Sequence, residues 1–129
     1  MSENTSETKN QMAEALKKLI KDRSFSKITV QDIVAACNIN RNTFYYHFEN
    51  NYDLLYKNEC QNWRNKINRV KNTAGFPADR LEKTQAAFAD FKKEALQRKK
   101  AVKTGTASPK EFTDWLYQQS DIILKLTTF

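Results

Sequence analysis

Hydrophobic residues recur every three or four positions along most of the chain, and this spacing predicts helices. No stretch alternates strictly between apolar and polar residues, as a half-buried strand does. Gly75 and Pro77 mark the clearest break. The chain is therefore predicted to be all-α. The expected helices cover residues 9–23, 29–37, 41–48, about 51–71, about 78–102, and 109 onward.

Polar residues stand where the expected helices begin and end. Thr29 and Asp32 have the spacing of a capping box, in which each side chain bonds to the other residue's backbone. Asn38 follows the second helix, and asparagine tolerates the left-handed conformation that ends many helices. These signals favour a short turn between two helices. Further helix starts are predicted at Asn40, Asn50 and Ser108, the last followed by Pro109 and Glu111.

The pattern divides the chain into three parts. Residues 1–8 are polar and are expected to form a disordered arm. Residues 9–50 are expected to form a compact three-helix head. Residues 51–129 are expected to form a helical dimerisation or regulatory region, beginning with a long connecting helix. The two helices that follow it are expected to contribute to a dimeric helical bundle.

The chain of 129 residues has a formal net charge of +7 and a pI of about 9.4. Such a balance favours a polyanionic partner, most simply nucleic acid, over the alternative of a merely basic soluble protein. Residues 1–72 carry 12 basic and 8 acidic side chains, and residues 73–129 carry 10 and 7. The positive charge is therefore spread over both halves of the chain.

Little in the composition supports catalysis. One histidine and two distant cysteines, Cys37 and Cys60, offer no metal cluster and no Cys/His pair, and two glycines cannot build a phosphate-binding loop. We expect no enzyme activity, no metal and no cofactor. The cysteines are expected to be reduced thiols. No signal segment or membrane span is expected, so a cytoplasmic, nucleoid-associated location is predicted.

Residues 29–48 form a helix-turn-helix pattern, in which the first helix supports the second against the major groove. On a wheel of roughly 100° per residue, Phe44 and Phe48 point inward. Tyr46 lies opposite them, flanked by Asn42 and Thr43. Exposed amide and aromatic side chains suit base edges and phosphates, whereas a merely solvated face would carry more Lys and Glu. This pattern favours a DNA-facing surface over a solvated one.

The segment ITVQDIVAACNINRNTFYYHFENNYDLL, residues 28–55, resembles the DNA-binding domain of the TetR family of bacterial repressors. The resemblance covers about residues 9–60. It implies a three-helix head that places residues 41–48 in the major groove of double-stranded DNA as part of a symmetric dimer. The shared features are Thr29, Ile33, Ala36, Ile39, Arg41, Thr43, Phe44, Tyr45, His47, Phe48, Leu54 and Leu55.

The resemblance also implies roles for individual residues. Thr29 and Gln31 are expected at the phosphate backbone, and the wheel favours Asn42 and Tyr46 as base readers. The full set of expected DNA-binding residues is Thr29, Gln31, Arg41, Asn42, Thr43, Tyr45, Tyr46 and His47. Tyr45 and His47 are expected to touch phosphates, although His47 can also be read as a hydrogen-bonded packing residue.

Two positions depart from the family's pattern. Asn38 stands where members usually have glycine, and asparagine can adopt the same backbone. Asn51 stands where members often have a phosphate-binding lysine. Loss of that lysine is expected to weaken nonspecific affinity and its salt dependence.

The C-terminal half is shorter than in typical family members, and this length disfavours a small-molecule effector. Two groups of residues in this half can each be interpreted in two ways. One is an expected dimer interface, whose alternative is packing within its own subunit: Phe112, Trp115, Leu116, Ile123 and Leu126. The other is a possible second basic patch, whose alternative is a solvated helix end: Arg98, Lys99, Lys100 and Lys103.

The sequence therefore predicts a sequence-specific DNA-binding protein, most simply a dimeric transcriptional repressor. One alternative is an oligomerising or adaptor protein that coats or bridges DNA, in plasmid or mobile-element maintenance or in chromosome organisation. Another is a protein-interaction module whose DNA-binding head is vestigial.

Overall fold

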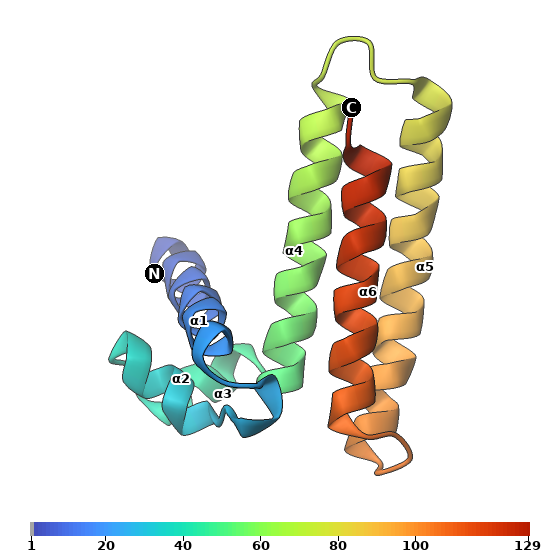
Figure 1. The fold of residues 1–129 in the computed structure, drawn as a ribbon. Coiled ribbons are helices and arrows are strands. Elements are labelled where there is room, and N and C mark those ends of the chain that lie inside the picture. Colours follow the sequence, from blue (N-terminus) through green and yellow to red (C-terminus); the bar gives the residue numbers. More distant parts are fainter. Residues whose placement is uncertain (1) are drawn as a thin grey trace. The chain divides into compact units, whose positions relative to one another are not determined.

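The computed structural model describes the backbone of residues 2–129 and the side chains of residues 7–129. Within this range the chain is helical and has no strand, which confirms the predicted all-α class (Figure 1). It divides into two compact units, Met1–Leu55 and Tyr56–Phe129. The helices are α1 (Ser2–Asp22), η1 (Phe25–Lys27, a 3-10 turn), α2 (Val30–Cys37), α3 (Arg41–His47), α4 (Asn51–Lys71), α5 (Ala78–Lys103) and α6 (Pro109–Thr127).

The first unit contains α1, η1, α2, α3 and the first turn of α4. Its core is built from the apolar positions of these elements, including Met12, Leu16, Phe25, Ile28, Ile33, Val34, Phe44, Phe48, Leu54 and Leu55. The helix α1 begins at Ser2, within the stretch of residues 1–8 for which the sequence favoured a disordered arm; Met1 lies outside the described residues. Residues 2–22 contain no glycine or proline that would interrupt the helix.

The capping predictions around the turn are confirmed. The Thr29 side chain accepts a hydrogen bond from the Asp32 backbone, and the Asp32 carboxylate accepts one from the Thr29 backbone. Asn38 ends α2 with φ 56° and ψ 47°, the left-handed conformation. Asn40 then caps α3 by accepting a hydrogen bond from the Thr43 backbone at 2.9 Å. The turn is thus set by local side-chain chemistry.

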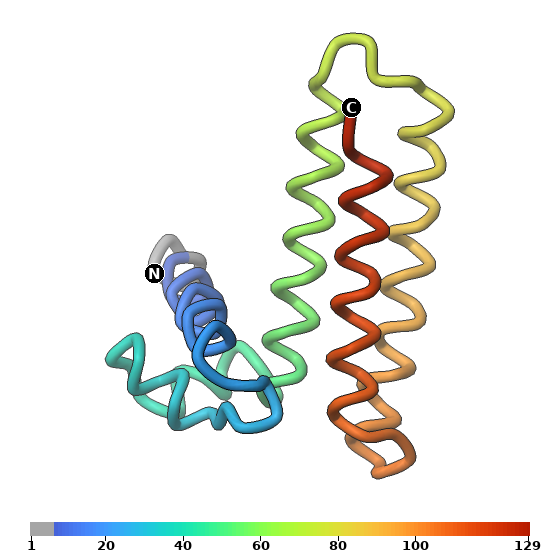
Figure 2. Tube along the Cα trace, in the orientation of Figure 1, coloured from blue at the N-terminus to red at the C-terminus, as the bar shows by residue number. Residues whose placement is uncertain are grey.

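The second unit is a three-helix bundle in which α4, α5 and α6 run side by side, with α5 antiparallel to the other two (Figures 1 and 2). Its core contains a stack of aromatic rings. Phe91 of α5 lies between Trp63 of α4, at 4.7 Å between ring centroids, and Trp115 of α6, at 5.6 Å. Phe88 extends the stack at 5.6 Å from Trp63. These rings join all three helices.

The stripe that was expected to form a dimer interface packs inside its own bundle. Phe112, Leu116 and Ile123 are at most 1% exposed, and Trp115 is 9% exposed against Phe91. Leu126 is partly buried. These residues therefore follow the alternative expectation, packing within their own subunit, because the other helices of the bundle cover the apolar face of α6.

The end of α6 is held by two arginines from the other helices of the bundle. Arg80 donates hydrogen bonds to the carbonyls of Lys125, Leu126 and Thr128 at 2.8, 3.0 and 2.6 Å. Arg69 donates to the Thr127 carbonyl at 3.1 Å. Since the last carbonyls of a helix lack intrahelical donors, these contacts satisfy them and fix the end of α6 to α4 and α5.

Candidate nucleic-acid interface

The inner side of α3 fixes this short helix to the first unit. Phe44 is fully buried and Phe48, just after the helix, is 4% exposed, with 5.6 Å between their ring centroids. Their burial agrees with the inward face that the wheel predicted. Because a seven-residue helix is too short to be stable alone, this packing is what holds α3 in place.

The outer side of α3 presents polar and aromatic groups to solvent. Tyr46 is 81% exposed and Tyr45 is 48% exposed, and Asn42 is also exposed. Thr43 and His47 are only partly exposed. The structure therefore places the two expected base readers, Asn42 and Tyr46, together on the open side of the helix.

Neighbouring contacts restrict the side chains around this outer face. The Arg41 guanidinium lies 5.9 Å from the centre of the Tyr45 ring, with a long contact of 3.5 Å from Nη2 to the tyrosine hydroxyl. The Tyr46 and His47 rings meet edge to face at 5.0 Å. Such contacts reduce the rotamer freedom that binding would otherwise have to remove.

Thr43 has a different position from its neighbours. Its backbone N–H and its hydroxyl both donate to the Asn40 side-chain oxygen, at 2.9 and 3.2 Å. The hydroxyl hydrogen is thereby used within the protein, and only its lone pairs and methyl group remain for a ligand. Thr43 is better suited to a thymine methyl than to donating to a phosphate.

The start of α2 carries the expected phosphate-binding residues Thr29 and Gln31, both exposed. Backbone and side-chain hydrogen bonds from Thr29 and the nearby Arg23 charge lower the pKa of Asp32 against the opposing effect of desolvation. Arg23 pairs with this carboxylate at 3.1 Å. The pairing offsets a negative charge that would otherwise repel a phosphate. Sequence reasoning missed Arg23, because its partner lies nine residues away in another element.

Asn51 has a structural role at the position where the family often has lysine. Its side-chain amide donates to the carbonyl of Ile28 at 2.5 Å, and its Oδ1 atom is buried without a partner. Ile28 directly precedes the cap residue Thr29. Asn51 therefore ties the start of α4 to the start of α2, a contact that sequence reasoning missed.

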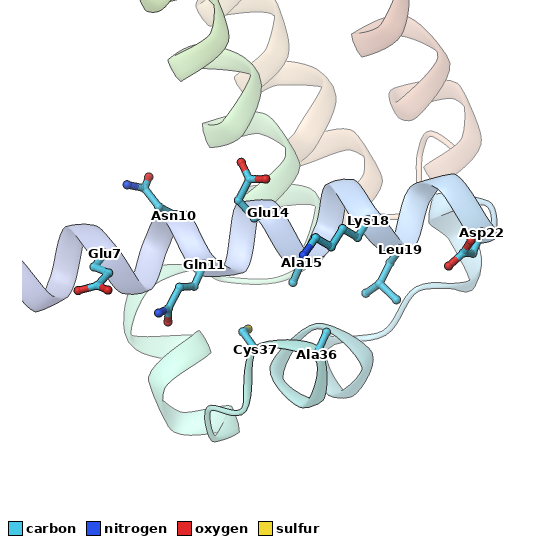
Figure 3. Close-up of a pocket in the computed structure, with 10 residues that line it drawn as sticks. All are labelled: Glu7, Asn10, Gln11, Glu14, Ala15, Lys18, Leu19, Asp22, Ala36 and Cys37. Atoms are coloured by element: carbon cyan, nitrogen blue, oxygen red, sulfur yellow. The ribbon is translucent and has the colours of Figure 1, made fainter.

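A cavity of about 460 Å³ lies between α1 and α2 and is lined by residues of these two helices. Gln11, Ala15 and Leu19 project from α1 toward Ala36 and Cys37 of α2 (Figure 3). Its lining includes three carboxylates and one lysine, so it does not suit a phosphate backbone: Glu7, Glu14, Asp22 and Lys18. Burial raises the pKa of the Cys37 thiol, whose Sγ donates to the Ile33 carbonyl at 3.0 Å.

The possible second basic patch is divided by its packing. Arg98 lies 4.7 Å from the centre of the Trp115 ring and pairs with Glu94 at 3.0 Å, and Lys99 lies 5.2 Å from the Tyr56 ring. Lys100 and Lys103 are exposed. Half of the run thus covers the aromatic core of the bundle, which weakens its interpretation as a dedicated phosphate site.

Within the described residues, no group of three or more His, Cys, Asp or Glu side chains is placed to hold a metal ion. No helix in the same range combines the length and apolar character needed to cross a membrane.

Comparison with known proteins agrees with this geometry. Residues 13–56 match the family described as "Bacterial regulatory proteins, tetR family". Searches of curated proteins and of solved structures found no match. The match covers the second half of α1, then α2, the turn, α3 and the start of α4, so it includes the exposed Asn42 and Tyr46 of α3. Residues 13–56 of this chain therefore form an N-terminal helix-turn-helix domain of the TetR type.

Proposed function

We propose that the protein is a sequence-specific regulator that binds an operator in double-stranded DNA as a homodimer, most simply as a repressor. The observation that carries this proposal is the outer side of α3. There Asn42 and Tyr46 are exposed, Tyr46 to 81%, while Phe44 on the inner side of the same helix is fully buried. An amide can bond to the edge of adenine, and a tyrosine can contact a base or a phosphate. The protein acts in the cytoplasm at the nucleoid.

The DNA contacts divide into two classes. Asn42, Thr43 and Tyr46 contact base edges in the major groove. The remaining residues position the head on the phosphate backbone: Thr29, Gln31, Arg41, Tyr45 and His47. Variants of the first class reduce discrimination between sites, whereas variants of the second class weaken binding to all sequences.

Dimerisation requires a surface other than the buried stripe of α6. On the exposed side of α6, Tyr117 and Leu124 are 41% and 51% exposed and lie seven residues apart. Residues at this spacing share one side of a helix, so they offer an apolar stripe to a second copy. Two heads joined in this way are expected to meet major grooves roughly 34–36 Å apart, or a multiple of this distance.

Selection of bound sites from random double-stranded DNA tests the proposal, with the mass of the complex measured in parallel. The expected result is one enriched motif with two-fold symmetry, bound by two copies of the chain. Recovery of unenriched DNA, or of a single half-site bound by one copy, would contradict it.

A second candidate function is coating or bridging of DNA. It is favoured by the distribution of charge, because residues 56–129 contain 15 basic and 8 acidic side chains whereas residues 1–55 contain 7 of each. Nuclease footprints separate the two functions. A footprint of constant length indicates an operator-bound regulator, and a footprint that spreads as protein concentration rises indicates coating.

A further inference from the structure

The net charge of the protein lies entirely in the second unit. Residues 1–55 carry no net charge, and residues 56–129 carry all seven excess positive charges. The unit that carries the helix-turn-helix is therefore not the source of the positive charge that attracts a polyanion. Part of that charge lies on α4.

Within the second unit, the exposed side of α4 contains amides and cations but no exposed carboxylate. The only acidic residue between positions 56 and 72 is Glu59, which is 9% exposed and accepts a hydrogen bond from Ser120 at 2.5 Å. The same stretch has five basic residues: Lys57, Arg64, Lys66, Arg69 and Lys71. The exposed surface of this part of the helix is therefore positively charged.

The amides of α4 form the centre of that surface. The buried positions point into the bundle: Tyr56, Cys60, Trp63, Ile67 and Val70. At roughly 100° per residue, the opposite side of the helix carries Arg69, whose guanidinium donates to the Thr127 carbonyl, and a row of amides. We name this row the amide face; its residues are Asn58, Gln61, Asn65, Asn68 and Asn72. Lys57, Arg64 and Lys71 follow one border of this face, one heptad apart.

The other helices are different in this respect. The exposed sides of the other long helices, α1, α5 and α6, mix acids with bases and form ion pairs such as Lys17–Glu14, Arg98–Glu94 and Lys110–Asp114. Asparagine is a weaker helix former than Lys, Glu or Gln, so a row of asparagines is not what helix stability favours. The composition of the amide face therefore indicates a ligand.

We propose that the amide face of α4, with its border of cations, is a second DNA-binding surface that holds the phosphate backbone of duplex DNA. Amides and cations are the groups that bond to phosphate and sugar oxygens, and the absence of exposed carboxylates removes repulsion. The surface adds sequence-independent affinity. It is separate from α3 and goes beyond the proposed operator recognition.

A single pair of variants tests the amide face in the full-length protein. Asn65→Glu places a carboxylate at its centre, and the matched control Gln118→Glu makes the same change at an exposed amide of α6. Glutamate favours helix at both positions, so both variants are expected to fold. The affinity for a short duplex of random sequence should fall severalfold for Asn65→Glu and stay near wild type for Gln118→Glu.

The salt dependence of binding tests the border of cations. Replacing Lys57, Arg64 and Lys71 together with glutamine should lower the slope of log affinity against log salt by about 2 to 3, since each lost phosphate contact contributes about 0.9. The matched control replaces Lys83, Lys93 and Lys125, which are exposed on α5 and α6 and remove the same charge. It should leave the slope nearly unchanged.

Three outcomes would overturn the proposal. One is an equal effect of the test variants and their controls on duplex binding. Another is that the wild-type protein binds single-stranded RNA or polyglutamate more tightly than duplex DNA, and that Asn65→Glu loses this tighter binding. The third is a change in the sedimentation of DNA-free Asn65→Glu with unchanged duplex affinity, which would assign the face to a protein partner.

Asn42→Ala separates the two DNA proposals, because it should remove site preference and leave random-duplex affinity almost unchanged.

Discussion

Within α3, residues two positions apart have opposite environments. Phe44 is fully buried, and Tyr46 is 81% exposed. Each depends on the short turn before the helix, where Asn38 and Asn40 set the backbone direction through a left-handed conformation and an N-cap. The exposed residues of α3 can therefore be changed with little loss of stability, whereas the turn residues tolerate only substitutions that keep this backbone geometry.

The left-handed Asn38 gives a prediction for stability. Asn38→Ala should lower the free energy of unfolding by about 1 kcal/mol or more, because residues other than Gly, Asn and Asp are strained at φ 56°. Asn38→Gly should stay near wild type, since glycine adopts this conformation without strain. Urea unfolding followed by circular dichroism measures both. Equal destabilisation by the two substitutions would show that the Asn38 side chain, and not its backbone, is what matters.

The lowered pKa of Asp32 gives a prediction for pH dependence. Because its folded pKa lies below the ordinary value of 3.8, the carboxylate stabilises the fold above that value and loses this effect as pH falls through the folded pKa. Wild type should therefore be more stable than Asp32→Asn at neutral pH, and the difference should shrink below pH 3.8. Urea unfolding of both proteins across acidic pH measures it. A difference that is independent of pH would contradict the assigned cause.

Helices and their caps could be predicted from the sequence, but the partners of their apolar faces could not. The spacing of Phe112, Leu116 and Ile123 shows that one side of α6 is buried. It does not show whether α5 or a second copy covers that side, since both would select the same residues. Lys99 presents the same problem, because its contact with the Tyr56 ring joins positions 43 residues apart. The contacts between elements that are far apart in the sequence are therefore the part of the structure that the sequence could not predict.

The aromatic stack predicts how the second unit responds to substitution. Phe91→Ala should lower the free energy of unfolding by about 3–5 kcal/mol, because it removes a buried ring between Trp63 and Trp115. Leu96→Ala is the control on the same helix, since Leu96 is 49% exposed. Its effect should be within about 0.5 kcal/mol. Thermal unfolding compares them, and similar values for both would place Phe91 outside the core.

At the scale of the whole molecule, the two units differ in charge and composition. The first unit is electrically neutral and carries the helix-turn-helix, and the second is positive and carries the exposed apolar residues of α6. We therefore assign base recognition to the first unit, and both subunit association and sequence-independent attraction to DNA to the second.

The proposed association through α6 gives a prediction at this scale. Leu124→Asp should shift the protein from dimer to monomer in sedimentation experiments, because it places a charge on the apolar stripe with Tyr117. Ile122→Asp is the control, since Ile122 is 41% exposed but lies on another side of the helix. If only Ile122→Asp produced monomers, the stripe would be assigned to the wrong side of α6.

The central claim is that α3 reads DNA through Asn42 and Tyr46. The most direct test compares the affinities of wild type, Asn42→Ala and Tyr46→Ala for a selected site and for a scrambled duplex, with Tyr117→Ala as a control at another exposed tyrosine. Loss of one good base contact weakens binding to the selected site by about 1–3 kcal/mol. The account predicts this loss for both α3 variants, no loss on the scrambled duplex, and wild-type discrimination for Tyr117→Ala. Undiminished preference for the selected site in both α3 variants would contradict it.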